Sequence, residues 1–116
     1  MKSLSAWYKT LFPQIVTGSQ KTMARAIWNG VVLAESAAYR LTEGNVYFPL
    51  DSVKQEYLRP SDHRSVCFWK GTARYFDAVV DGKTNKNAAW LYPNPTPAAV
   101  ALKDHVAFWR GVKVER

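Results

Sequence analysis

Glycine-containing turn signals constrain this chain more than any other feature, because they divide it into short segments of β type. Asn29-Gly30 separates two apolar segments, and both of its residues tolerate the positive φ of a type I′ hairpin turn. Glu43-Gly44-Asn45 predicts a second hairpin, and Asp81-Gly82 predicts a third hairpin after a long strand. The chain from Met23 onward is therefore expected to form antiparallel sheets.

The segments between these turns have the composition and alternation of strands. We expect strands at 25–28, 31–34, 39–41, 46–48, 72–80 and 105–114. A short helix is predicted at 51–58, with Asp51 as the N-cap residue and Pro60 beyond its end. A second short helix is predicted at 97–103, because Thr96 precedes Pro97 at the first helical position.

The last predicted strand, 105–114, alternates between two sets of side chains. One set is apolar and is expected in the core: Val106, Phe108, Val112 and Val114. The other set is expected to face a pocket or solvent: His105, Trp109, Lys113 and Glu115. This pattern places His105 among the candidate ligand-binding residues.

Residues 1–22 differ from the rest and are interpreted as an N-terminal extension, with a single β domain at 23–116. The extension carries apolar residues at helical spacing: Leu4, Trp7, Tyr8, Leu11, Phe12, Ile15 and Val16. Pro13 interrupts this stripe, and Thr17-Gly18-Ser19-Gln20 reads as a linker. An amphipathic anchor to a membrane or partner is one interpretation. A helix packed on its own domain, or sequence upstream of a start at Met23, is the other.

Composition limits the classes of function. The chain has 116 residues and a formal net charge of +7, but its basic residues are scattered, so nucleic acid is not the expected partner. The single cysteine, Cys67, excludes an internal disulfide and fits a reducing compartment. The sequence contains neither a membrane-spanning apolar run nor a secretory signal pattern, so a cytoplasmic location is expected.

A dense aromatic stretch supplies the candidate site. Cys67, two tryptophans, two tyrosines and a lysine lie within 66–75 and 87–95. Rings of this kind can wall a pocket for a planar or sugar-like ligand, while lysine and histidine supply donors. The predicted ligand-binding residues are Trp69, Lys70, Tyr75, Trp90, Tyr92 and His105. The other interpretation is that all of these rings are core, and Gly71 marks either a bulge or a close backbone approach.

Catalytic and metal chemistry are weakly represented. Cys67 is the only candidate thiol nucleophile, and composition alone offers His63, His105 and Lys70 as candidate bases for it. His63 and His105 lack the spacing of a metal site, so no metal and no cofactor are expected. Glu35 is considered as a partner of Lys70 or Arg74 across the sheet. The carboxylate pair and phosphate-binding loop that nucleotidyl transfer needs are not recognisable.

Several short motifs of the sequence resemble those of a bacterial family catalogued as domain of unknown function 427, which is sometimes labelled nucleotidyltransferase-like. They are Ala26-Ile27-Trp28-Asn29-Gly30, Leu33-Ala34-Glu35-Ser36, Glu43-Gly44-Asn45-Val46-Tyr47-Phe48-Pro49, Cys67-Phe68-Trp69-Lys70-Gly71-Thr72-Ala73, Ala89-Trp90-Leu91-Tyr92-Pro93 and His105-Val106-Ala107-Phe108-Trp109. The resemblance implies a mainly β, β-tent-like (Mss4-like) domain of two antiparallel sheets. Phe68 stands where the family usually has proline, and 1–22 has no counterpart in its pattern.

These observations together predict a non-enzymatic module that binds an unidentified small molecule in an aromatic-walled pocket. The alternatives are an enzyme that depends on Cys67 and a structural or interaction protein that uses residues 1–22. Peripheral membrane contact through 1–22 and a homodimer through an edge strand remain open partner interpretations.

Overall fold

The computed structural model describes residues 15–17 and 22–116. The predicted helical stripe and linker of the N-terminal extension fall mainly on 1–14 and 18–21, which lie outside the described residues. Within the extension, Val16 and Thr17 form strand β1 and pair with strand β4 (Arg40–Thr42). The chain therefore enters the sheet ahead of the predicted boundary at Met23.

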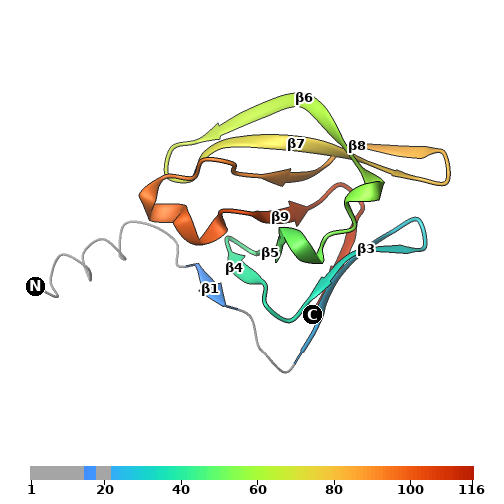
Figure 1. Ribbon diagram of the computed structural model, residues 1–116, viewed down its shortest axis with the longest axis horizontal. Helices are drawn as coiled ribbons and strands as arrows, with labels where there is room; N and C mark the ends of the chain where they lie inside the picture. The colour runs from blue at the N-terminus through green and yellow to red at the C-terminus, as the bar shows by residue number, and fades with distance from the viewer. Residues whose placement is uncertain (1–14, 18–21) are drawn as a thin grey trace, which may run out of the picture.

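The described residues form two antiparallel sheets (Figure 1). In its spatial order, the seven-stranded sheet of this part of the chain contains β1 (Val16–Thr17), β4 (Arg40–Thr42), β5 (Asn45–Pro49), β9 (His105–Phe108), β8 (Lys83–Leu91), β7 (Gly71–Val80) and β6 (Leu58–Cys67). The three-stranded sheet contains β10 (Lys113–Glu115), β2 (Ala24–Trp28) and β3 (Val31–Ser36). The predicted mainly β class is confirmed.

The predicted hairpin turns are confirmed, and their backbone explains why these residues occupy them. Asn29 and Gly30 have φ values of 50° and 77°, and Glu43 and Gly44 have 52° and 78°. Both turns therefore use positive φ at two successive residues, as a type I′ turn requires. Asp81 and Gly82 repeat the pattern between β7 and β8, with φ values of 50° and 74°.

The predicted helix at 51–58 is wrong. The segment forms two separate 3₁₀ turns, η1 (Leu50–Ser52) and η2 (Gln55–Tyr57), and Leu58 already belongs to β6. Between these turns Val53 bridges Ala34, and the Lys54 N–H donates to the Leu33 carbonyl at 2.8 Å. Pairing with β3 holds the chain extended there, so an α-helix cannot continue. The second predicted helix is a 3₁₀ helix, η3 (Pro97–Leu102), entered through Thr96.

The predicted continuous strand at 105–114 is also wrong. Arg110 and Gly111 have φ values of 56° and 87°, and the Val112 N–H donates to the Trp109 carbonyl at 3.2 Å. This turn ends β9 and sends β10 to the small sheet. The apolar set nevertheless packs in the main core as expected, because the turn returns Val112 and Val114 to the same side.

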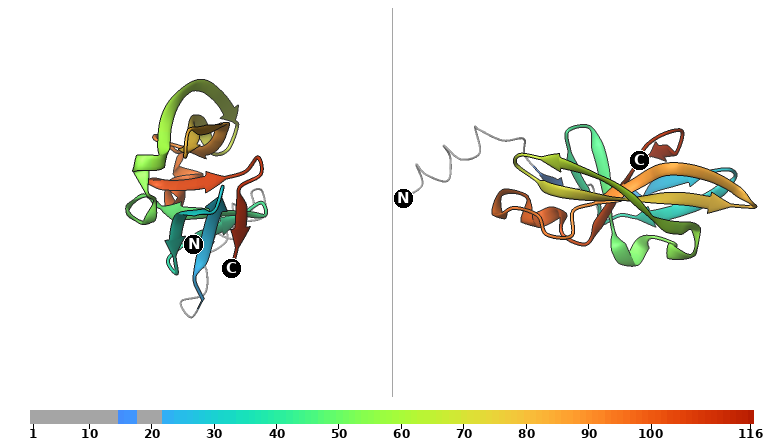
Figure 2. Two further views of the ribbon diagram at one scale, coloured as in Figure 1. Left: turned by 90° about the vertical axis from the view of Figure 1, so that its right-hand side faces the viewer. Right: turned by 90° about the horizontal axis from the view of Figure 1, so that it is seen from above.

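The two faces of the large sheet have different coverings. Phe48, Val106 and Ala89 lie on the face that packs against the small sheet and form the main core. Figure 2 shows β2 and β10 running steeply across β9, so that the two sheets meet at an angle. The neighbouring residues Tyr47 and Trp90 face the other way because side chains alternate along a strand. This second face carries the candidate site and is covered in part by η3, through Ala99 and Leu102.

No helix in the described part of the chain has the length and apolar character needed to cross a bilayer.

Candidate ligand-binding site

An aromatic row crosses the second face of the large sheet. It consists of Tyr47, Trp90, Tyr75, Trp109 and His63. The strand register builds it, because Tyr75 pairs with Trp90 and Trp90 pairs with Ala107. The small Ala107 side chain leaves room above β9. The rings of Tyr47 and Trp90 therefore meet edge to face, with centroids 6.1 Å apart.

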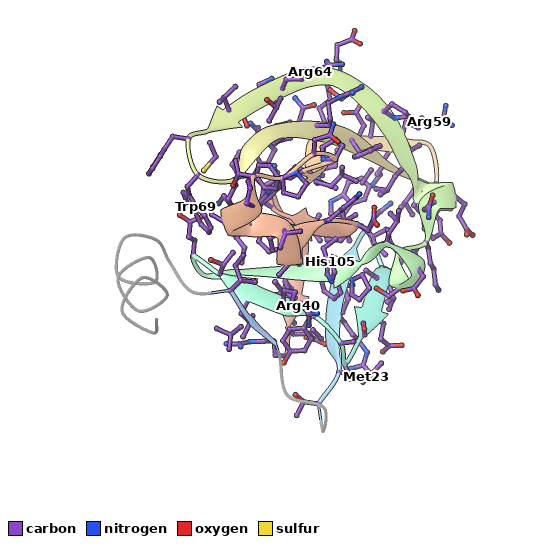
Figure 3. All side chains as sticks on the ribbon, turned by 60° about the vertical axis from the view of Figure 1, so that its left-hand side comes forward. Met23, Arg40, Arg59, Arg64, Trp69 and His105 are labelled. Carbon is purple, nitrogen blue, oxygen red and sulfur yellow. The ribbon has the colours of Figure 1, made fainter. Side chains whose placement is uncertain are left out.

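At one end of the row, which we call the lysine end, Lys70 is enclosed by Trp69, Tyr92, Tyr47 and Glu43. The Lys70 ammonium lies 5.3 Å from the Trp69 ring centroid and 5.6 Å from that of Tyr92, within cation–π range. It also forms an ion pair with the carboxylate of Glu43, which sits on the β4–β5 turn. Figure 3 shows Trp69 at the side of the molecule, where β6 turns into β7.

Electrostatics keep Lys70 charged although only 6% of the residue is exposed. Burial alone would lower its pKa, but the hydrogen bond to Glu43, the charge that Tyr47 carries once ionised and the charge of Glu43 outweigh burial and raise the pKa above its ordinary value. Lys70 is therefore a permanent cation at neutral pH. It is suited to holding rings and carboxylates in place and unsuited to acting as a general base.

Neutral phenols surround this cation. Burial raises the pKa of both Tyr47 and Tyr92, and the net shift is larger for Tyr92, where the neighbouring charges raise the pKa as well. The Tyr47 hydroxyl is fully buried, and the neighbouring Trp90 and Tyr92 side chains approach it without forming a hydrogen bond of ordinary geometry. The Thr42 hydroxyl is likewise buried and has no partner among the described residues. Such groups usually mark a bound water or ligand, or a local cost to stability.

A close backbone approach locks the lysine end. A Cβ atom on Gly71 would lie 3.1 Å from the Asn94 carbonyl oxygen, and Gly71 has a φ of 115°. The Thr96 N–H donates to the Lys70 carbonyl at 3.1 Å, and the Thr96 hydroxyl donates to the Trp69 carbonyl. Gly71 therefore marks a close approach, one of the two roles expected for it, and Trp69 and Lys70 are held by the segment that leads into η3.

The other end of the row, which we call the open end, reaches the surface at Trp109 and His63. Trp109 is 41% exposed, and its indole N–H donates to the Asn87 carbonyl at 2.5 Å. The Arg110 guanidinium lies 4.7 Å from its ring centroid. His63 lies 4.5 Å from Tyr75, and the Tyr75 hydroxyl shares a 2.9 Å hydrogen bond with Ser65. These exposed rings are fixed in place by their neighbours.

A polar cavity of about 540 Å³ adjoins the open end through His63 and Asn87; it is lined by Pro60, Ser61, Asp62, His63, Asp77, Lys86 and Asn87. It forms where the ladders lose register, between Pro60 and Arg64 on β6 and between Phe76 and Ala78 on β7. Irregularities of this kind re-aim side chains and are frequent beside binding sites.

Asn87 organises this cavity. Its φ is 56°, its N–H donates to the Asp77 carboxylate at 2.8 Å, and its amide oxygen accepts from the Ser61 hydroxyl at 2.5 Å. Neither Asp77 nor Asn87 is among the residues predicted for the site. The break in the ladder that aims them depends on strand pairing, and the only local signal is an asparagine, which tolerates positive φ.

The structure brings together all predicted site residues except His105. Trp69, Tyr75, Trp90 and Tyr92 share one buried cluster, beside Lys70. His105 instead lines a separate cavity of about 620 Å³ with Pro49, Leu50, Asp51, Gln55, Lys103 and Asp104. Its Nδ1 lies 2.7 Å from the Lys103 carbonyl oxygen.

The other two candidates, Cys67 and Glu35, contact neighbouring side chains away from the cavity at the open end. Cys67 is half-buried and packs against the aromatic cluster. Glu35 pairs with Arg25, its cross-strand neighbour, so the considered partnership with Lys70 or Arg74 is wrong. Across the described residues, His, Cys, Asp and Glu side chains form no group able to hold a metal ion.

Comparison with known proteins places the chain by family alone. A search of curated proteins finds no match. A family model described as a domain of unknown function, DUF427, matches residues 17–116, which include both ends of the aromatic row and every strand from β2 to β10. The match covers most of the chain, and the protein therefore belongs to the DUF427 family.

Proposed function

We propose that this protein is a small-molecule-binding module whose ligand occupies the open end of the aromatic row. The observation that carries the proposal is the coincidence of exposed, fixed rings with a polar cavity. Trp109 and His63 present ring surface, and the cavity of about 540 Å³ begins at His63 and Asn87. Binding sites commonly combine apolar ring surface with a few convergent polar groups in this way.

The chemistry of the lining favours a ring-shaped ligand that carries hydroxyl groups. Aromatic rings stack on the apolar face of such a molecule, while carboxylate and amide oxygens accept hydrogen bonds from its hydroxyl groups. Asp62 and Asp77 supply carboxylates, and Lys86 supplies a donor, all within the same cavity. A planar heteroaromatic ligand is the other candidate, because it stacks equally well but uses fewer of these acceptors.

The predicted pocket residues take different parts in this proposal. Tyr75 and Trp90 support the exposed ring of Trp109 directly. The Trp109 ring centroid lies 6.2 Å from that of Tyr75 and 5.4 Å from that of Trp90. Trp69, Lys70 and Tyr92 are buried at the lysine end and act by holding the sheet and η3 together. A rigid support of this kind lowers the entropic cost of binding at the open end.

The test is a ligand-detected screen by NMR with a library of monosaccharides, cyclic diols, nucleosides and planar heteroaromatic fragments at millimolar concentration. We expect hits that shift the Trp109 indole N–H and the Asn87 amide. In Trp109→Ala these hits should weaken at least 10-fold. Phe68→Ala is the matched control, because it removes an exposed ring from the β6–β7 turn, away from the cavity.

The result also separates the ligand classes. Hits confined to saccharides and diols support the hydroxyl-bearing ligand, and hits confined to planar fragments support the heteroaromatic one. A library without hits, or hits that Trp109→Ala leaves unchanged, would contradict the proposed function.

A further inference from the structure

We propose that Arg64 and Arg74 form a second binding site, which takes the phosphate group of a small molecule. Both arginines point away from the aromatic row, because Ser65 and Tyr75 occupy the alternating positions that face it. The site therefore lies on the other side of the β6–β7 ladder from the aromatic row. Figure 3 shows Arg64 on β6 at the outer margin of the molecule.

The strand register sets the two arginines directly opposite each other. Arg64 and Arg74 are Cα partners in the β6–β7 ladder, and both are exposed. Like charges at directly opposite positions of neighbouring strands repel each other and destabilise the pair. No carboxylate of the described residues lies within ion-pair distance of either guanidinium. An anion between the two arginines would remove this repulsion.

A small cavity accompanies the pair. It has a volume of about 240 Å³ and is lined by Arg64, Thr72, Arg74, Pro93 and Asn94. The lining contains two guanidinium groups, a hydroxyl and an amide, and it contains no acidic side chain. The two larger cavities differ, because each is lined by aspartates. Among the described residues that line this cavity, both charged side chains are arginines.

Parts of this wall are held in place before any ligand arrives. The Arg64 Nη1–H donates to the Asp62 carbonyl at 2.9 Å. The backbone of Asn94 lies close to Gly71, because a Cβ atom added to Gly71 would lie 3.1 Å from the Asn94 carbonyl oxygen. The backbone that carries Asn94 is therefore fixed relative to β7. Donors fixed in this way bind an anion with less loss of entropy.

The donor set favours phosphate over carboxylate. A carboxylate presents two oxygens in one plane and is satisfied by a single bidentate guanidinium. A phosphate carries more charge and directs its oxygens tetrahedrally, so it can bridge two arginines and still accept from a hydroxyl and an amide. The volume of about 240 Å³ accommodates a phosphate group and leaves room for the adjoining part of the molecule.

The experiment is isothermal titration with inorganic phosphate, phenyl phosphate and acetate at low salt. We expect phosphate binding to weaken at least 10-fold in Arg64→Gln and in Arg74→Gln, and acetate to bind more weakly than phosphate to the unaltered protein. Arg59→Gln is the matched control, because it removes an exposed arginine from the same strand, outside the cavity lining. Trp109→Ala should bind phosphate normally, which separates this site from the proposed function.

The two phosphate probes distinguish the sources. Tighter binding of phenyl phosphate than of inorganic phosphate indicates a phosphate ester, and the reverse order indicates the free ion. Thermal unfolding supplies a second readout, since phosphate should raise the Tm of the unaltered protein and leave that of the glutamine variants unchanged. Phosphate binding that survives both substitutions, or falls equally in Arg59→Gln, would overturn the proposal.

Discussion

The two ends of the aromatic row use the same residue types on the same sheet face but have opposite surroundings. At the lysine end, η3 and the segment before it cover the rings, and Trp69 is only 4% exposed. At the open end this cover is missing, and Trp109 remains 41% exposed beside a cavity. Ring content alone therefore does not identify a binding surface. Whether other segments cover a ring decides whether it belongs to the core or can contact a ligand.

The sharpest test of this difference compares Trp69→Ala with Trp109→Ala. Trp69→Ala should lower the free energy of unfolding by about 3–5 kcal/mol, because it empties a buried site. Trp109→Ala should cost about 1 kcal/mol, since much of its ring is already in water. Urea unfolding measures both, and equal losses would mean that the two ends do not differ as described.

The close approach of Gly71 to Asn94 at the lysine end predicts the next largest loss of stability. Gly71→Ala should destabilise the protein by about 1–3 kcal/mol, because alanine disfavours the φ of 115° and its Cβ would meet the Asn94 carbonyl. Thermal unfolding measures the loss. Gly82→Ala serves as the control: it also has a positive φ, of 74°, but nothing lies within 4 Å of the added Cβ. A loss that is the same for both would assign the effect to φ alone.

Alkaline pH should weaken the lysine end selectively. The pKa values of Lys70, Tyr47 and Tyr92 are all raised in the folded state, so the unfolded chain loses these protons first. Their contribution to stability is complete below the unfolded pKa values of 10.0 and 10.5 and disappears as the pH rises through the higher folded values. Urea unfolding between pH 8 and pH 11.5 should show this decline.

The variants Tyr92→Phe and Lys70→Met provide the matched comparison for the pH series. Each removes one of the raised pKa values, and we expect a shallower decline of stability above pH 10 in both. A slope unchanged in both variants would show that alkaline unfolding begins elsewhere.

The smallest expected effect concerns the buried Tyr47 hydroxyl. Tyr47→Phe removes a polar atom that has no hydrogen-bond partner among the described residues, so stability should stay the same or rise by about 1 kcal/mol. Urea unfolding is again the measurement. A loss of stability instead would reveal a bound water or another partner at this hydroxyl, and so a polar site at the lysine end.

Local chemistry explains which elements could be predicted. The turns at Asn29-Gly30 and Asp81-Gly82 follow from positive φ, which few residue types tolerate, so neighbouring residues are sufficient to find them. The helix predicted at 51–58 fails because Val53 and Lys54 bond to β3, a distant segment of the chain. The break at Arg110-Gly111 was visible only as a glycine within an otherwise regular alternation.

Residue type and alternation were sufficient to predict the β class, the main hairpin turns and the concentration of rings around Cys67–Tyr75 and Trp90–Tyr92. Tertiary packing was needed to show which rings are covered, that His105 lies in another cavity, and that Arg64 stands opposite Arg74. The physical reason is that burial and cross-strand partners come from segments far apart in the chain. Their pairing carries no signal within either segment alone.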